Sequence, residues 1–391
     1  MFLVAEPICW GMEHVPFNAG LLRTIRLAFP AERVHFFGEK SHVEHVKGYI
    51  GPQFAHAIVW EPLVLPPRHA GFSSRLHADI RLIRCLLDKM NGDPLNHVLV
   101  ITGNPSILWA LKFFVHTVHG DKNIQVIFHG ILSSLGSRRS LRPFRRYCDI
   151  RASLSKFNHR RIQYIVLEES IRDAVVRCLS SLKDRMVVLD HPIPLDGDAH
   201  EANDFSFPVQ FGFLGLANEH KGFSKYLTVA REITSKYPGR AKFHVIGRVQ
   251  NQYKHLRIPE IDFLGEKPGS ERLSRDEYAQ HVNKLHFTCL FYQDRHYEFS
   301  ASGVLLDSIA WEKPVIASQL PIFRNIETVF GNIGYLCDNG SFSRTIETIL
   351  TRTDSDHYRQ QVLNMRKVKV SRSPESLAGK YRELVDILKH V

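Results

Sequence analysis

Short apolar runs alternate along the first half of the chain with longer segments in which apolar residues recur every three or four positions. We predict the apolar runs to be buried strands at residues 1–5, 34–38, 55–60, 97–102, 125–129 and 164–167. The amphipathic segments between them predict helices at residues 18–28, 41–50, 73–90 and 105–119. Strands that are apolar throughout and separated by helices are typical of a parallel sheet covered on both faces. We therefore expect a doubly wound α/β domain in this half.

Residues 190–207 interrupt the pattern, because they are largely polar and contain two prolines and a glycine near their start. This composition is typical of an interdomain linker. A second series follows, with strands predicted at residues 209–214, 241–246, 261–264, 287–291 and 314–317. Helices are predicted after Gly222, from Ser274, over 304–311 and over 376–390. The expected organisation is an N-terminal domain, a linker, a C-terminal domain and a closing helix, at residues 1–195, 196–207, 208–373 and 374–391.

Composition agrees with two globular domains. A chain of 391 residues is longer than one hydrophobic core usually organises, and 44% hydrophobic with 23% charged residues argues against extensive disorder. The six cysteines show no paired spacing, which favours a reducing compartment and a cytoplasmic protein. The first residues predict no signal peptide, and no apolar stretch approaches the roughly 20 residues of a membrane span.

The net charge of +11 is concentrated in residues 138–161, which we call the basic block. One acid, Asp149, accompanies its basic residues, which are Arg138, Arg139, Arg142, Arg145, Arg146, Arg151, Lys156, Arg160 and Arg161. Apolar residues are interleaved with them, namely Leu141, Phe144, Tyr147, Ile150 and Leu154. Such a segment suits an anionic membrane surface, although a solvated helix face shows the same pattern. No base-stacking or groove-reading module accompanies it, so we expect no nucleic-acid partner.

The most informative stretch for chemistry is YEFSASGVLLDSIAWEKPVIAS, residues 297–318. It reads as a loop after a buried strand, in which Ser302 and Gly303 lead into the start of a helix. Backbone N–H groups at a helix start form an anion site suited to a diphosphate. Asp307 lies on the first turns of that helix, where a carboxylate can accept hydrogen bonds from sugar or ribose hydroxyls.

This stretch resembles the donor-site signature of retaining GT-B glycosyltransferases related to family 4. In that signature an acid, a glycine-containing loop and a second acid on a helix precede a Gly-x-Pro-Val-Ile-Ala-Ser strand. Residues 313–318, KPVIAS, match the end of it, and Asp307 takes the place of the second acid. The first acid is out of register by one residue: Phe299 occupies its position and Glu298 is the nearest carboxylate.

A second stretch, FGFLGLANEHKG at residues 211–222, resembles the family's strand–Gly-Arg-x-x-x-Glu-Lys-Gly element. There an arginine and a lysine neutralise the leaving diphosphate. Gly215 and Lys221 match the glycine and the lysine, whereas Leu216 replaces the arginine. Arg248, after the next strand, is a candidate for the missing positive charge. An isolated Lys221 would be an ordinary surface lysine.

Two N-terminal segments complete the candidate site. His129 ends a strand next to glycine, and in the resembling enzymes a histidine here contacts the donor sugar, although a lone histidine is usually structural. Glu13 and His14 lie in the first loop, where related enzymes place a segment over donor and acceptor; a solvated loop fits them equally well. We expect no metal site, because the closely spaced histidines lack Cys or acidic partners. No Walker loop or GxGxxG is present, which disfavours kinases and dinucleotide dehydrogenases.

The resemblance implies the GT-B fold: two Rossmann-like doubly wound α/β domains facing a cleft, with the C-terminal helix packing back toward the N-terminal domain. It implies transfer of a sugar, with hexosyl transfer favoured, from a nucleoside diphosphate sugar to an acceptor hydroxyl, with retention and without a metal or other cofactor. The expected acceptor is lipid-linked or an oligosaccharide, as in bacterial surface polysaccharide or glycolipid assembly. We expect the enzyme in the cytoplasm, peripheral on the inner face of the membrane through the basic block. The alternatives are a nucleotide-sugar epimerase and an inactive GT-B partner subunit.

Overall fold

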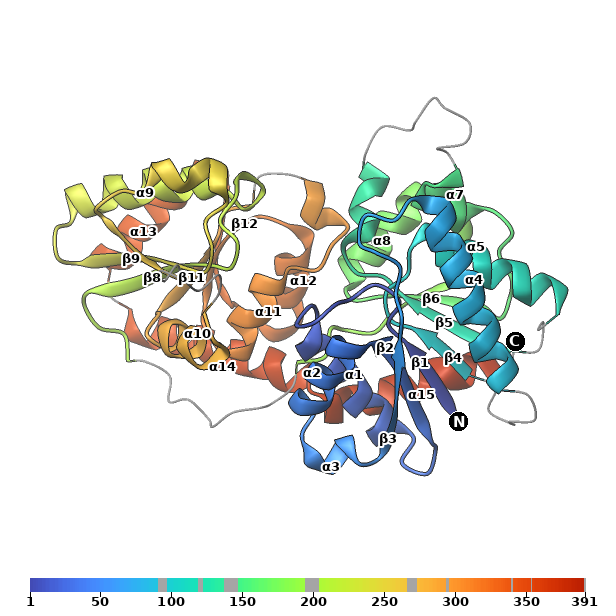
Figure 1. Ribbon diagram of the computed structural model, residues 1–391. Helices are drawn as coiled ribbons and strands as arrows, with labels where there is room; N and C mark the ends of the chain where they lie inside the picture. The colour runs from blue at the N-terminus through green and yellow to red at the C-terminus, as the bar shows by residue number, and fades with distance from the viewer. Residues whose placement is uncertain are drawn as a thin grey trace. The chain divides into compact units, whose positions relative to one another are not determined.

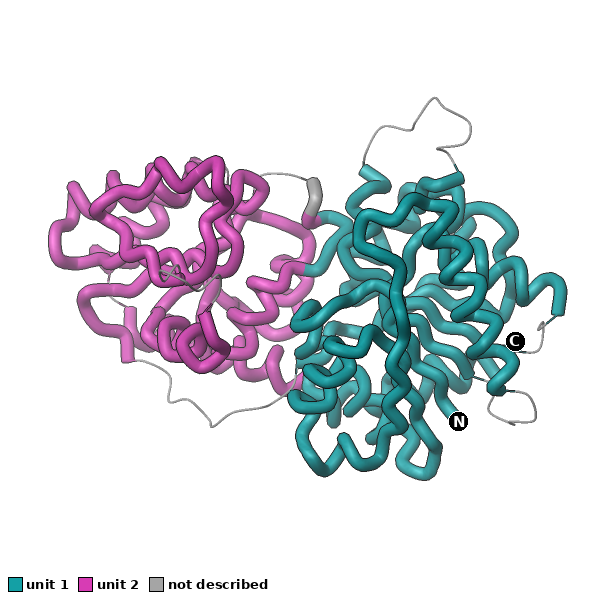
Figure 2. The backbone as a smooth tube through the Cα atoms, viewed as in Figure 1, with its two compact units in different colours: residues 1–194, 298–301, 372–391 teal, residues 195–297, 302–371 magenta. Residues whose placement is uncertain are grey.

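The chain folds into two compact units (Figure 2). The first unit contains residues 1–194, 298–301 and 372–391, and the second contains residues 195–297 and 302–371. The computed structural model describes residues 1–90, 97–118, 122–136, 147–193, 204–265, 273–292, 295–338, 340–352 and 354–389. Most of the predicted linker lies outside these ranges. The structure assigns residues 298–301 to the first unit, whereas the sequence pattern places them in the C-terminal domain.

The first unit is built on a seven-stranded sheet in which all the neighbouring strands are parallel. Its strands are β1 (Phe2–Ala5), β2 (Val34–Glu39), β3 (Ile58–Leu63), β4 (His97–Val100), β5 (Asn123–Ile127), β6 (Ile162–Val166) and β7 (Met186–Val188). They lie in the order β3-β2-β1-β4-β5-β6-β7. The prediction of a strand at 55–60 is displaced, because Gly51 and Pro52 open a short helix before β3 begins.

The helices of the first unit join successive strands and cover the sheet (Figure 1). They are α1 (Val15–Ala28), α2 (Lys40–Tyr49), α3 (Pro52–Ala55), α4 (Phe72–Lys89), α5 (Pro105–Thr117), α7 (Ile150–Ser155), α8 (Glu169–Cys178) and α15 (Pro374–Lys389). The last of these, α15, joins the core of the first unit: Leu377, Tyr381 and Val385 pack in one cluster with Phe2 and Leu21. The predicted return of the closing helix to the N-terminal domain is confirmed.

The second unit repeats the design with six parallel strands in the order β10-β9-β8-β11-β12-β13. They are β8 (Val209–Leu214), β9 (Ala241–Ile246), β10 (Ile261–Leu264), β11 (Phe287–Leu290), β12 (Val315–Ser318) and β13 (Gly334–Cys337). The helices are α9 (Phe223–Lys236), α10 (Arg275–Asn283), α11 (Gly303–Ala310), α12 (Pro321–Phe330), α13 (Phe342–Thr351) and α14 (Ser355–Ser371). The expected pair of doubly wound α/β domains is confirmed.

Strand order reverses direction beside the first strand of each sheet, between β1 and β4 and between β8 and β11. Helices on the two sides of such a point run to opposite faces of the sheet. The carboxyl ends of the flanking strands are therefore where doubly wound folds bind their ligands. Within the described residues, no helix is both long and apolar enough to cross a membrane.

A buried ion pair joins distant parts of the first unit. The Arg372 guanidinium donates to both carboxylate oxygens of Glu168, at 2.5 and 2.9 Å. The two side chains are only 5% and 6% exposed. The Ile193 amide also donates to the Arg372 carbonyl at 2.8 Å. Because Ile193 and Arg372 stand next to two places where the chain passes between units, the pair fastens both of these segments to β6 and α8.

We predict that Glu168→Gln destabilises the first unit by about 3–5 kcal/mol, because it leaves the Arg372 charge buried without its counterion. Urea-induced unfolding measures the loss. The matched control is Asp356→Asn, which removes an exposed i,i+3 ion pair with Arg359 and should change the unfolding free energy by less than about 1 kcal/mol. Equal effects of the two substitutions would contradict a stabilising role for the buried pair.

Candidate functional site

Three neighbouring strands of the second sheet end in glycine at the same level. Leu214 pairs with Ile246 and Ile246 with Leu264, so Gly215, Gly247 and Gly265 follow in register. A Cβ on Gly247 would lie 2.3 Å from the Gly215 oxygen, and a Cβ on Gly265 would lie 2.2 Å from the Gly247 oxygen. Backbone therefore packs on backbone here, and φ values of +76° at Gly215 and +135° at Gly247 also favour glycine. We call this arrangement the glycine ladder.

Lys221 is held over the glycine ladder by the turn before α9. The Asn218 side chain accepts a hydrogen bond from the Lys221 amide at 3.1 Å. Gly222 has φ +76°, and a Cβ there would lie 2.0 Å from the Phe291 oxygen, so the turn can approach β11 closely only with glycine. The Lys221 Nζ lies 3.1 Å from where a Cβ on Gly215 would stand. Burial lowers the pKa of Lys221 to about 8, against the opposing attraction of Asp307.

Asp307 lies on α11, whose start is capped by Ser302. The Ser302 hydroxyl accepts a hydrogen bond from the Leu305 amide at 3.2 Å. The Tyr278 hydroxyl of α10 donates to Asp307 Oδ2 at 2.8 Å. Burial raises the pKa of Asp307 to about 6, whereas Tyr278 and the charges of Arg275 and Lys221 favour the ionised form. A cation and an anion whose charges interact thus lie at the carboxyl edge of the second sheet.

Two other predicted positions, Gly303 and Arg248, are exposed at this edge. Gly303 is exposed, and a Cβ there would meet no atom within 4 Å, so the helix start does not require glycine for space. Arg248 directly follows Gly247 and is exposed, and its carbonyl accepts from the Ala217 amide at 2.7 Å. Leu216 is 38% exposed at the position where the resembling enzymes carry arginine.

Glu298 belongs to the first unit and is not grouped with Lys221 and Asp307. Its Oε1 accepts from the Arg177 guanidinium of α8 at 2.9 Å. The next residue, Phe299, is buried in the core of the first unit. The Ser300 hydroxyl lies 3.4 Å from the position of a Cβ on Gly130. The assignment of Glu298 to the donor sugar stays a prediction.

His129 and His14 lie together in the first unit. The His129 ring lies 4.8 Å from the His14 ring and 4.2 Å, edge-on, from Phe17. Its Nε2 is buried and has no hydrogen-bond partner among the described residues. Burial, then His14 and His191, lower its pKa well below the usual value, so the ring is neutral. His14 itself is exposed with φ 52° at the start of α1.

Both carboxylate oxygens of Glu13 interact with neighbouring groups. Its Oε2 accepts from the Trp10 amide at 3.0 Å, and its Oε1 lies 2.9 Å from the Arg68 guanidinium. Sequence reasoning missed Arg68, Arg177, His191 and Tyr278. His191 was missed because the sequence pattern does not predict β7, the strand that precedes it. Arg68, Arg177 and Tyr278 were missed because their bonding partners are distant in sequence.

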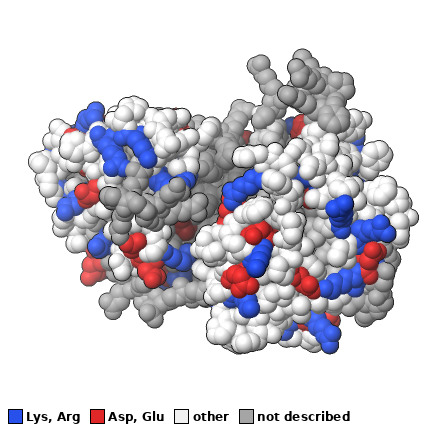
Figure 3. All heavy atoms as spheres, viewed as in Figure 1, with Lys and Arg blue, Asp and Glu red and all other residues white. Residues whose placement is uncertain are grey.

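Part of the basic block lies in described residues. Ile150 and Leu154 are buried in the core of the first unit, so they do not form the free apolar face that the pattern predicted. Tyr147 is half exposed. Residues 137–146 lie outside the described ranges. On the face drawn in Figure 3, basic and acidic side chains are interspersed over the first unit.

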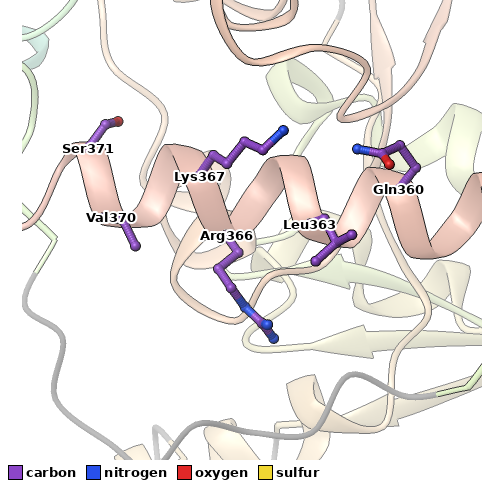
Figure 4. A pocket seen from close by; sticks show the side chains of 6 residues that line it. All are labelled: Gln360, Leu363, Arg366, Lys367, Val370 and Ser371. Carbon is purple, nitrogen blue, oxygen red and sulfur yellow. The ribbon is translucent and has the colours of Figure 1, made fainter.

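Two surface hollows lie apart from these residues. One of about 590 Å³ is lined by the α14 residues Gln360, Leu363, Arg366, Lys367, Val370 and Ser371 (Figure 4). Another of about 580 Å³ lies at the amino ends of β8, β9 and β11, where Lys242, His244 and His286 line it. Across the described ranges, no three His, Cys, Asp or Glu side chains gather in a way that would hold a metal ion.

Comparison by sequence identifies no relative: no family model and no curated protein matches the chain. A glycosyltransferase from Rickettsia africae is similar over 99% of this chain and 98% of its own, with a TM-score of 0.67 and 11% identity. Sucrose-phosphate synthase from Thermosynechococcus elongatus is similar over 99% of this chain and 99% of its own, with a TM-score of 0.66 and 13% identity. HepE from Anabaena, solved in complex with UDP, covers 98% of this chain and 99% of its own, with a TM-score of 0.63 and 13% identity. This chain has the two-domain α/β GT-B fold.

Proposed function

We propose that this protein is a glycosyltransferase that moves a sugar from a nucleoside diphosphate sugar to an acceptor hydroxyl. The observation that carries the proposal is the Lys221 ammonium beside Gly215 of the glycine ladder, with the Asp307 carboxylate interacting with its charge, at the carboxyl edge of the second sheet. Binding of a diphosphate requires a cation, and binding of a ribose requires an oxygen that accepts hydrogen bonds from its hydroxyls. The UDP bound by HepE, a protein of the same fold, supports a donor of this class.

The proposed roles follow from the charges. Lys221 would stabilise the departing diphosphate, whose negative charge develops in the transition state, and the start of α11 at Ser302 and Gly303 would contribute backbone N–H groups. Gly215 leaves space at the strand end, and Arg248 would add a second cation. Asp307 would accept from the ribose hydroxyls.

We assign the remaining roles to the first unit. Glu298 and His129 would contact the donor sugar, with neutral His129 offering its unpartnered Nε2. Glu13 and His14 would orient the acceptor hydroxyl. Retention of configuration and action without a metal ion or other cofactor are parts of the proposal that rest on the resemblance of residues 297–318 to retaining enzymes.

Incubation with a panel of UDP-, GDP- and ADP-sugars tests the activity itself. We expect slow hydrolysis of one donor to free nucleoside diphosphate, because water can replace the acceptor. An epimerase would return an isomerised nucleotide sugar instead, and an inactive partner subunit would neither bind nor cleave any donor. Either result would contradict the proposal.

Lys221→Ala should lower turnover of that donor by about 10²–10³ at saturation, since the ammonium meets the leaving charge only in the complex. Stability should change little. Lys242→Ala provides the control, because Lys242 is an exposed lysine at the amino end of β9, away from the candidate site. Turnover of Lys221→Ala close to that of the control would rule out the proposed role.

Asp307→Asn and Glu298→Gln should separate nucleotide binding from sugar binding. Asp307→Asn should weaken calorimetric binding of free nucleoside diphosphate by about tenfold, the effect of roughly one lost hydrogen bond to a charged group. Glu298→Gln should weaken binding of the intact donor and leave free nucleotide affinity unchanged. Wild-type nucleotide affinity in both variants would refute the Asp307 assignment.

For the acceptor, we propose a lipid-linked molecule or an oligosaccharide in surface polysaccharide or glycolipid assembly, with the protein docked on an anionic membrane surface through the basic block. Because Ile150 and Leu154 are buried, the attraction would be electrostatic rather than insertion of an apolar face. Each basic residue near an anionic surface contributes about 1 kcal/mol.

Arg142/Arg145/Arg146→Glu should therefore abolish co-sedimentation with vesicles that contain phosphatidylserine, and raised salt should weaken wild-type binding. Neutral phosphatidylcholine vesicles are the control and should recover little of either protein. Equal recovery with both lipids, or an unaffected triple variant, would contradict membrane docking without touching the proposed activity.

A further inference from the structure

Tyr278 is placed rigidly beside Asp307. A capping box fixes the start of its helix, α10: Ser274 accepts from the Glu277 amide while the Glu277 side chain accepts from the Ser274 amide. The Tyr278 ring packs edge-on against Trp311, with centroids 5.5 Å apart at 71°. The Arg275 guanidinium lies 5.6 Å from the same Trp311 ring. The hydroxyl therefore reaches Asp307 from a clamped ring, not from a mobile surface side chain.

The hydrogen bond from Tyr278 makes the two carboxylate oxygens of Asp307 inequivalent. Oδ2 accepts from Tyr278 at 2.8 Å, whereas no hydrogen bond between described residues reaches Oδ1. Burial, together with Asp307 itself, raises the pKa of Tyr278 well above its usual range, so the tyrosine stays protonated and always donates. A donor of this kind favours the ionised carboxylate.

The other charges around Asp307 are cationic or already paired. Arg275 of α10 and Lys221 before α9 both favour its ionised form. Tyr292, after β11, is a neutral phenol, because burial raises its pKa well above the usual range. On α14, which packs against α11, Arg366 and Lys369 are paired with Glu312 rather than with Asp307. Tyr278 is thus the neutral group that hydrogen-bonds the carboxylate directly.

We propose that Tyr278 is a positioning residue for nucleotide binding, which keeps the Asp307 carboxylate ionised and occupies Oδ2 so that Oδ1 is left to accept from the ribose. This inference rests on the proposed function and names a residue that the donor-site resemblance does not include. It predicts a specific pH behaviour, because nucleotide binding needs the carboxylate and protonation of Asp307 removes it.

Calorimetric titration with UDP, GDP and ADP between pH 5.5 and 8.5 provides the test. For the wild type, affinity for the nucleotide that binds should fall as the pH drops through about 6, where Asp307 takes up a proton. Tyr278→Phe removes a hydrogen bond to the ionised form, so the acid limb should move to higher pH by about one unit. Affinity near pH 6 should then be reduced by about three- to fivefold beyond the wild-type loss, whereas at pH 8, where Asp307 is ionised in both proteins, the two affinities should agree.

Two further variants separate positioning from a purely structural role. Tyr226→Phe removes another buried tyrosine hydroxyl of the second unit, which donates to the backbone oxygens of Phe211 and His244 at 3.0 and 2.9 Å. It should lower thermal stability and leave the acid limb where it is. In an Asp307→Asn background, Tyr278→Phe should no longer shift the limb, because the titrating group is gone.

An acid limb at the same pH in Tyr278→Phe and the wild type would overturn the inference while leaving the proposed donor site intact. A shift equal to that of Tyr226→Phe would overturn it too, since general loosening of the unit would then explain the effect. If the wild type binds none of the three nucleotides at any pH, the proposed function fails first, and the inference falls with it.

Discussion

Direct packing of backbone on backbone at the ends of β8, β9 and β10 is the constraint on which the candidate donor site depends. A single methyl group on Gly247 or Gly265 would collide with the neighbouring strand end, so the strands could no longer stay paired up to their last residue. The absence of side chains also leaves room for the Lys221 chain to cross above Gly215. The same glycines therefore meet a geometric requirement of the sheet and determine where the Lys221 charge is placed.

Burial away from water determines how strongly the Lys221 charge interacts with other charges. Burial moves the pKa of Lys221 downward and that of Asp307 upward, and each group partly restores the ionised form of the other. A cation that is poorly hydrated interacts strongly with an arriving anion, because little water has to be displaced first. Under the proposed function, the candidate site would be prepared for a diphosphate before one binds.

Half of the second sheet could be predicted closely from the sequence, because β8, β9 and β10 are short apolar runs that end at a glycine. Residues 209–214, 241–246 and 261–264 are strands with the expected bounds. The three-residue β7 was missed, because so short a run carries no periodicity of its own.

The partners in the candidate site could not be predicted in the same way. Tyr278 and Asp307 are 29 positions apart, and Arg177 and Glu298 are 121 apart. In the sequence Tyr278 is one more apolar position on an amphipathic helix. Glu298 lies in a motif of the second half of the chain, yet Phe299 beside it is buried in the first unit. The hydrophobic pattern does not predict that residues 298–301 belong to the first unit.

The return of α15 to the first unit bears on how the protein is made. Phe2, on the first strand, packs against Tyr381 with ring centroids 6.4 Å apart, but the ribosome must synthesise the whole second unit before Tyr381 emerges. At rates of about 5–20 residues per second, the apolar face that α15 covers stays uncovered for many seconds before α15 is synthesised. The second unit can complete its core first, although most of its residues come later in the chain. Nascent-chain chaperones would therefore meet an open N-terminal half for most of translation.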